Sequence, residues 1–141
     1  MNRRQQKKLT HRLIDAILSG DTGRVRAALR SGADPERGTG EGATPLYLAS
    51  VSGHAGIARL LLEAGAAPDN ESSGSGSEGT PLCAAACWGH TETVRELLSH
   101  GADPQLREDH GTGRTPLAWA NDAGPHNETA DLLIAAGAVP E

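Results

Sequence analysis

Two short sequence words recur along the chain at a nearly constant interval, and this regularity constrains the fold more than any other feature. The tripeptide Thr-Pro-Leu begins at Thr44, Thr80 and Thr115, at intervals of 36 and 35 residues. A second word, Gly-Ala-X-Pro, begins at Gly32, Gly65, Gly101 and Gly137. Self-similarity at such a period is typical of solenoids, in which each unit packs against its neighbours. The sequence therefore predicts a stack of about four units.

Each word carries a local structural signal. The Thr hydroxyl can accept a hydrogen bond from an unpaired amide of the first helical turn, and proline fits the first helical position, so Thr-Pro-Leu predicts a helix start. A glycine such as Gly53 or Gly89 then ends that helix. A second helix follows, with apolar residues at i, i+3 and i+4, as in Val94, Leu97 and Leu98. Each unit is therefore predicted to be a pair of short antiparallel helices.

The second unit, "GATPLYLASVSGHAGIARLLLEAGAAP", resembles the ankyrin repeat core T-P-L-H-x-A-A-x-x-G-H-x-x-I-V-x-L-L-L-x-x-G-A. The resemblance covers roughly residues 12–141, in repeats of about 12–40, 41–76, 77–111 and 112–141. "LIDAILSGDTGRVRAALRSGADP" is similar to the N-terminal capping repeat of the family, although it lacks Thr-Pro-Leu. The resemblance implies a single all-α solenoid domain of stacked helix-turn-helix ankyrin repeats, joined by β-turn or hairpin loops.

Residues 1–11 form a basic N-terminal segment before this domain. Leu9, Leu13 and Ile17 are spaced four residues apart, which favours an extension of the first helix over disorder. Both alternatives stay open at this point.

The chain also departs from the family pattern. Where the family has histidine after Thr-Pro-Leu, this sequence has Tyr47, Cys83 and Ala118, so a stabilising hydrogen bond is absent and we expect a looser stack. The connection "PDNESSGSGSEG" is rich in Ser and Gly, and its composition indicates flexibility.

Charge is distributed unevenly along the chain, whose net charge is −5. Residues 1–30 contain eight Lys or Arg and two acids, which gives +6, whereas residues 31–141 contain five basic and sixteen acidic residues, which gives −11. Most of the surface should therefore repel a phosphate backbone, so we do not expect a nucleic-acid ligand. A protein partner with a basic surface is favoured instead.

Composition also bears on the compartment. We find no apolar run of signal-peptide or membrane length, so we expect no membrane association. Two cysteines are too few for a disulfide framework, which favours a reducing cytoplasm.

The two cysteines, Cys83 and Cys87, lie at i and i+4 of a predicted helix. Their Cβ atoms would be ~5–6 Å apart, whereas a disulfide needs about 3.5–4.5 Å. Zinc sites usually need three or four protein ligands, and the stacked neighbours Tyr47, Val51, Ala118 and Asp122 offer at most one more. We therefore expect no metal and no cofactor, and we expect apolar buried or half-buried thiols. A reactive thiol pair remains an alternative.

By resemblance, the two positions before each inter-helix turn vary within the family and line a concave surface. The residues at these positions are Leu18 and Ser19, Val51 and Ser52, Cys87 and Trp88, and Asp122 and Ala123. An exposed Trp88 would be a strong binding hot spot, because it buries a large area at little entropic cost. Alternatively, Trp88 packs on its own turn. Trp119 is expected in the core.

The predicted partner-binding surface therefore consists of Trp88, Cys87, Val51, Ser52, Asp122 and Ala123, with Glu41, Glu78 and Arg114 at the hairpin tips. The repeat forms no pocket with a catalytic constellation, so we do not expect an enzyme. The leading hypothesis is a monomeric protein-interaction module. The alternatives are an inhibitor or immunity-type protein that covers a basic active site, a thiol redox protein that uses Cys83 and Cys87, and self-association through Trp88.

Overall fold

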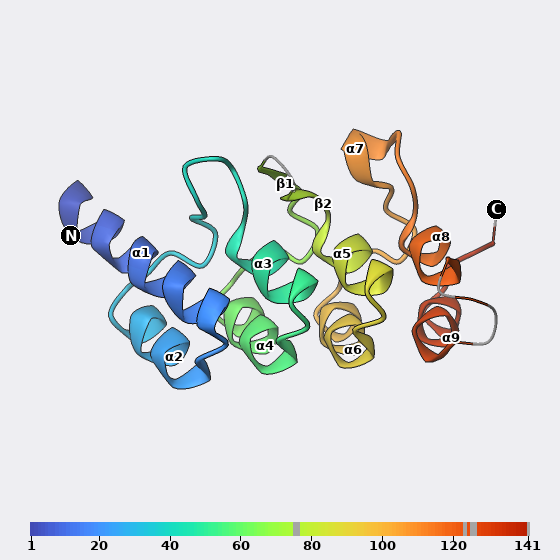
Figure 1. The fold of residues 1–141 in the computed structure, drawn as a ribbon, viewed down its shortest axis with the longest axis horizontal. Coiled ribbons are helices and arrows are strands. Elements are labelled where there is room, and N and C mark those ends of the chain that lie inside the picture. Colours follow the sequence, from blue (N-terminus) through green and yellow to red (C-terminus); the bar gives the residue numbers. More distant parts are fainter. Residues whose placement is uncertain (75–76, 123, 125–126, 141) are drawn as a thin grey trace.

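The computed structural model describes residues 1–74, 77–122, 124 and 127–140. In this part of the chain, eight of the helices form two parallel rows (Figure 1). The row that we call inner contains α1 (Arg3–Ser19), α3 (Pro45–Val51), α5 (Pro81–Cys87) and α8 (Pro116–Asn121). The outer row contains α2 (Thr22–Arg30), α4 (Ala55–Glu63), α6 (Thr91–Ser99) and α9 (Glu128–Ala135). This is the helical solenoid that the repeat predicts.

The connections between units project beyond the inner row (Figure 1). The second contains strands β1 (Ser72–Gly74) and β2 (Ser77–Gly79), which pair antiparallel with Ser72 opposite Gly79. The third contains the short helix α7 (Glu108–Gly111). The strands show the backbone pairing of this connection, and the flexibility that its Ser and Gly content indicates stays a prediction.

Three inner helices begin with the same cap. The hydroxyls of Thr44, Thr80 and Thr115 accept hydrogen bonds from amides three residues later, at 3.1, 3.2 and 3.1 Å respectively. Proline occupies the first turn of each of these helices, where an N–H would have no partner within the helix, so its absence costs no hydrogen bond. The repeated Thr-Pro-Leu word therefore forms the same helix start three times.

The core lies between the two rows. It is built from the apolar face of each helix, and its largest fully buried aliphatic side chains are Leu13, Ile17, Val25, Leu46, Ile57, Leu61, Leu82, Val94, Leu97 and Leu133. Full burial of one such side chain contributes roughly 1.5–3 kcal/mol. Because each of the eight helices in the two rows contacts both its pair partner and its neighbours in the row, the core runs the length of the solenoid.

The turn within one helix pair receives a histidine from the next. Gly53 has a φ of 73°, and a Cβ at this residue would lie 2.6 Å from Nδ1 of His90. Nε2 of His90 is 3.1 Å from the carbonyl oxygen of Val51, to which it donates. Gly53 is therefore required both by the left-handed backbone and by the close approach of the next unit.

The basic residues 1–11 do not form a separate segment. The side chain of Asn2 caps α1, accepting from the amide of Gln5 at 2.9 Å, and the helix continues without interruption to Ser19. Leu9 and Thr10 are buried against the rest of the unit. Of the two alternatives for residues 1–11, the structure shows the helical extension from Arg3 onward.

A regular set of hydrogen bonds joins successive units at the base of the connections. The side chains four residues after the closing glycines, Glu36, Asp69 and Gln105, each accept from a backbone amide of the next unit. The distances are 3.1 Å to Ala67 N, 3.0 Å to Asp103 N and 3.0 Å to Val139 N. These bonds fix the spacing at which the connections stand beside one another.

Candidate functional site

The predicted residues Val51, Ser52, Cys87, Trp88, Asp122 and Ala123 form what we call the stripe, and its described members lie at the C-terminal ends of the inner helices. Ser52, Trp88 and Asp122 are exposed, whereas Val51 and Cys87 are half-buried. Ala123, which completes the predicted set, lies outside the described residues. The described members are therefore accessible to a partner to different degrees.

Trp88 is 66% exposed, and Leu18, at the same end of the first inner helix, is 61% exposed. Single exposed apolar residues are common on protein surfaces. These two, however, both occupy the pair of positions that precedes a turn glycine, Leu18 two residues before Gly20 and Trp88 directly before Gly89. The exposed fraction of Trp88 shows that most of its ring is not covered by its own turn.

At the other end of the stripe, Asp122 is paired within the chain. Nη1 of Arg114 donates to Oδ2 of Asp122 at 2.7 Å, and Nη2 donates to the carbonyl oxygen of Ala118 at 2.9 Å. The guanidinium also lies 4.3 Å above the ring of Trp119, in cation–π geometry. Two residues predicted to bind a partner separately, Arg114 and Asp122, therefore neutralise each other.

Trp119 is half-buried and packs against the core, as expected in part. Its indole Nε1–H donates to Oε1 of Glu108 at 2.8 Å. An indole that is partly buried needs such a partner for its N–H. Trp119 therefore joins the core to the third connection.

Glu108 has a central position that the sequence did not predict. Partial burial raises the pKa of its carboxyl, while the hydrogen bond from Trp119 acts in the opposite direction. Its charge contributes to raised pKa values of Tyr47 and Cys87, after the larger contribution of burial at both residues. Glu108 is therefore close enough to the stripe for its charge to affect the pKa of the Cys87 thiol.

The third connection has an unusual backbone at its tip. Asp109 and His110 have φ angles of 52° and 53°, a left-handed conformation that is uncommon outside glycine. The amide of His110 donates to the carboxylate of Glu71 at 3.2 Å, and Nδ1 of His110 is 3.2 Å from the same carboxylate. Glu71 therefore links the second connection to the third.

The remaining predicted hairpin residues, Glu41 and Glu78, are exposed. Together with Glu71, Glu108 and Asp109 they give the connections an acidic character. The acidic residues stand beyond the inner row, on the side to which the connections project.

Both cysteines are free thiols. Burial raises the pKa of Cys83 to about 12, and its Sγ donates to the carbonyl oxygen of Arg114 at 3.6 Å. Burial, together with the charges of Glu108 and Asp122, also raises the pKa of Cys87. A raised pKa disfavours the thiolate, which is the nucleophilic form. Within the described residues, no group of three or more His, Cys, Asp or Glu side chains could hold a metal ion.

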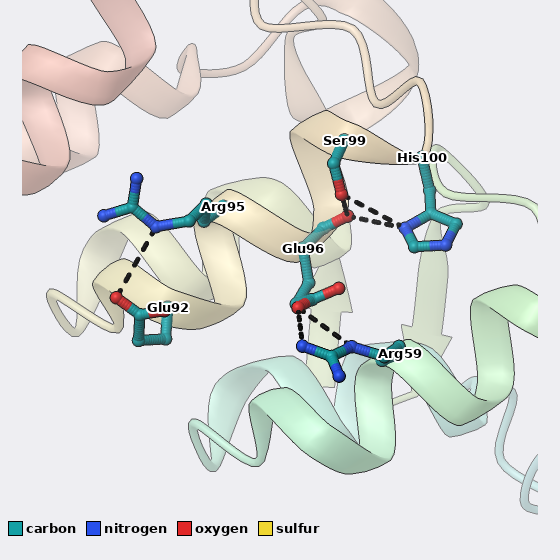
Figure 2. Close-up of polar contacts among 6 residues, drawn as sticks. All are labelled: Arg59, Glu92, Arg95, Glu96, Ser99 and His100. Carbon is teal, nitrogen blue, oxygen red and sulfur yellow. Dashed lines mark hydrogen bonds and ion pairs between the residues drawn. The ribbon is translucent and has the colours of Figure 1, made fainter.

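The outer row carries a different kind of surface. Figure 2 shows Arg59 of α4 and Glu96 of α6 facing each other across two units, with Nε of Arg59 3.0 Å from Oε1 of Glu96. Arg95 pairs with Glu92 on the same helix and with Glu128 of the next outer helix. Ser99 Oγ donates to the carbonyl oxygen of Glu96, and His100 Nδ1 lies 2.9 Å from the same oxygen. These charged side chains pair with one another, whereas the connections carry an excess of acids.

No helix among the described residues is both long and apolar enough to cross a bilayer.

Comparison with known proteins agrees with this architecture. The family model for ankyrin repeats in three copies matches residues 13–108 and again residues 69–141. The human protein named ankyrin repeat domain-containing protein 39 is 39% identical over 57 residues, which are 40% of this chain and 31% of that protein. The match thus spans about a third of the length of that relative. Because the family model covers most of the chain, and the stacked helix pairs have the expected form, the chain belongs to the ankyrin repeat family.

Proposed function

We propose that this protein binds a partner protein through the stripe at the ends of the inner helices and through the acidic connections beside it. Ankyrin repeats are generally protein-binding modules without catalytic activity, which supports the class of function. The particular surface is supported by the residues that follow.

The observation that carries the proposal is the exposure of Trp88. Trp88 is 66% exposed at a position where the family resemblance implies that stacked units place variable residues in a row. Large rigid aromatic residues often dominate binding energy, because they bury much apolar area and lose little entropy. Leu18 and Val51 provide further apolar surface at corresponding ends of α1 and α3. The stripe therefore offers an apolar centre with a polar edge, which is the usual anatomy of an interface.

Charge supports the kind of partner. Residues 31–141 carry a net charge of −11, and the exposed acids Glu41 and Glu78 stand on the connections. A partner with a basic surface would be attracted over long range and would bind faster at low salt. An inhibitor that covers a basic active site is a specific form of this proposal. It is favoured if affinity falls steeply as ionic strength rises from about 0.05 to about 0.5 M.

The thiol redox alternative has less support. Such chemistry needs a thiolate near neutral pH, whereas burial raises the pKa of both Cys83 and Cys87. Titration of the two thiols with a colorimetric reagent tests it, because rapid reaction near pH 7 would favour this alternative over the binding module.

We also propose that the protein is a cytoplasmic monomer. Two free thiols are compatible with a reducing compartment. Self-association through Trp88 is the competing possibility, and it would give a mass that rises with concentration in analytical ultracentrifugation.

The test compares Trp88→Ala with a matched variant, Ile134→Ala. Ile134 is also a large exposed apolar side chain, 49% exposed, but it lies on the outer helix α9. Partners captured from cells that make the protein would be identified with the wild-type chain and quantified with both variants. Affinity for each purified candidate would then be measured by calorimetry.

We expect Trp88→Ala to weaken binding by about 2 kcal/mol or more, roughly 30-fold, and Ile134→Ala to leave it nearly unchanged. Equal affinities for wild type and Trp88→Ala would remove the stripe as the binding surface. A larger loss for Ile134→Ala would move the surface to the outer row.

A further inference from the structure

A groove lies at the N-terminal end of the solenoid, away from Trp88. It runs between the first half of α1 and the first connection, and its volume is about 880 Å³. Arg3, Lys7 and His11 of α1 line one wall, and Arg37 of the connection lines the other. Neither the stripe nor the acidic connections of the later units contribute to this lining.

The spacing of the α1 residues gives the groove a regular basic wall. Arg3, Lys7 and His11 are at i, i+4 and i+8, so they share one face of the helix. At 1.5 Å per residue they extend over ~12 Å, which corresponds to about four residues of an extended peptide. The repeat unit alone does not require this wall, because Arg3 to His11 belong to the N-terminal extension of the first helix.

The positive charge in the groove is only partly balanced by the chain itself. The carboxylates in the lining belong to Asp15 and Glu36. Both oxygens of Glu36 are already hydrogen-bonded, at 3.1 Å to the amide of Ala67 and at 3.1 Å to Nδ2 of Asn70. Glu36 is therefore used in the contact with the second unit, and no ion pair is formed by Arg3, Lys7 or Arg37 within the described residues.

The loop side of the groove supplies hydrogen-bond donors as well as charge. Gly38 and Gly40 belong to the lining, and their amides donate no hydrogen bond to the part of the chain that the structure describes. A Cβ at Gly38 would lie 1.7 Å from the carbonyl oxygen of Ala43, so the loop can pass this point only with glycine. Cationic side chains together with unpaired amides suit a carboxylate ligand.

We propose that this groove binds a short acidic segment of a protein, independently of the stripe that contains Trp88. The two surfaces lie at opposite ends of α1, with Arg3 and Leu18 separated by ~20 Å along the helix axis. A peptide is favoured over a nucleic acid because the polyphosphate chain would continue past the groove, where residues 31–141 carry a net charge of −11. The protein would then hold a basic partner surface at the stripe and an acidic segment at its N-terminal end.

The sequence offers a matched pair of variants for the test. Arg3→Gln with Lys7→Gln removes two charges from the groove wall. Arg4→Gln with Lys8→Gln removes two charges from the same helix, one residue further along, and neither of these residues lines the groove. Lys8 instead lines a separate pocket with Met1 and Arg12. Circular dichroism would check that both double variants keep the helix content of the full chain.

The probe is a fluorescent peptide of about eight residues that alternates Glu and Ser, measured by anisotropy. The same peptide with Gln in place of Glu and a single-stranded oligonucleotide of about ten thymidines serve as comparisons. We expect the Glu peptide to bind, with the affinity about tenfold weaker in the Arg3 and Lys7 variant and changed by less than about twofold in the Arg4 and Lys8 variant.

Three results would overturn the proposal. They are equal losses in the two double variants, tighter binding of the oligonucleotide than of the Glu peptide, and no binding of the Glu peptide to the wild-type chain. Trp88→Ala is expected to leave peptide affinity unchanged, so the outcome does not depend on the function proposed for the stripe.

Discussion

The helix pairs and the connections between them differ in how closely one unit repeats another. The inner helices α3, α5 and α8 begin with a threonine cap whose hydrogen bond varies only between 3.1 and 3.2 Å. The connections have three different forms. The first closes through Thr39 and Ala43, the second is a two-stranded hairpin, and the third contains α7 with two left-handed residues.

This difference shows where the chain allows variation. Residues that cap helices and fill the core must satisfy the same local geometry in every unit, so they recur. A connection must only reach the next helix and form hydrogen bonds with its neighbours. The side chains of Glu36, Asp69 and Gln105 form these bonds. Surface connections of this kind tolerate variation and often carry function. The exposed acids Glu41 and Glu78, and Arg37 of the basic groove, all belong to these connections.

The largest expected effect tests the turn inside a helix pair. Gly53→Ala places a Cβ in a left-handed backbone and against the His90 ring, so we expect a loss of about 2–4 kcal/mol in the free energy of unfolding. Gly56→Ala is the control, because it lies in α4 with no atom within 4 Å of the added Cβ. There we expect a gain of about 0.5–1 kcal/mol. Urea denaturation followed by circular dichroism measures both, and similar stabilities would contradict the role of the turn.

A smaller effect tests whether the caps are equivalent. Thr44→Val, Thr80→Val and Thr115→Val each remove the acceptor of one first-turn amide and keep the side-chain shape. We expect each to lower the free energy of unfolding by about 1 kcal/mol. Urea denaturation of the three variants should give values that agree within about 0.5 kcal/mol. A wide spread would show that the helix starts depend on their different connections.

The smallest effect concerns the third connection. Glu108→Gln keeps an acceptor for the indole N–H of Trp119 and removes a charge whose folded-state pKa is raised by burial. Folding therefore disfavours the ionised carboxyl, and the variant should be more stable than wild type above that pKa, by less than about 0.5 kcal/mol after solvent screening. The gain should vanish below the unfolded-state pKa, where Glu108 is protonated in both states.

The same variant has a second readout. Because the charge of Glu108 contributes to the raised pKa of Cys87, its removal should lower that pKa and speed thiol modification at mildly alkaline pH. Unchanged reactivity, with stability that is also unchanged between about pH 4 and about pH 7, would show that Glu108 is not coupled to the stripe.

The exposure of the candidate site was predictable only in part. The family resemblance placed Trp88, directly before a turn glycine, on a surface that could bind a partner, but packing of Trp88 on its own turn remained an alternative, and the 66% exposure of Trp88 comes from the structure. By contrast, the pairing of Arg114 with Asp122 could not be predicted, since it depends on how the third connection meets α8. The role of Glu108 depends on the same geometry, because its partner Trp119 lies eleven residues further along the chain.

The basic groove also could not be predicted from the sequence. The excess of Lys and Arg in the first thirty residues was evident, as was a spacing of Leu9, Leu13 and Ile17 that suits a helix. The rotation of α1 against its neighbours decides which of these basic residues face the first connection. That rotation turns Arg3 and Lys7 toward the groove and leaves Arg4 and Lys8 outside its lining.

The sequence by itself determined the period, the four helix pairs, their caps and their turns, because each depends on residues within one or two helical turns of one another. Only the tertiary structure decided which charges are balanced and which remain available. A groove, or an ion pair between two elements, requires side chains from different helices or connections to meet, and the local pattern contains no information on the distances between them. The helices therefore follow from the repeated Thr-Pro-Leu and Gly-Ala-X-Pro motifs, whereas the surfaces that can bind a partner follow from how the helices and connections pack together.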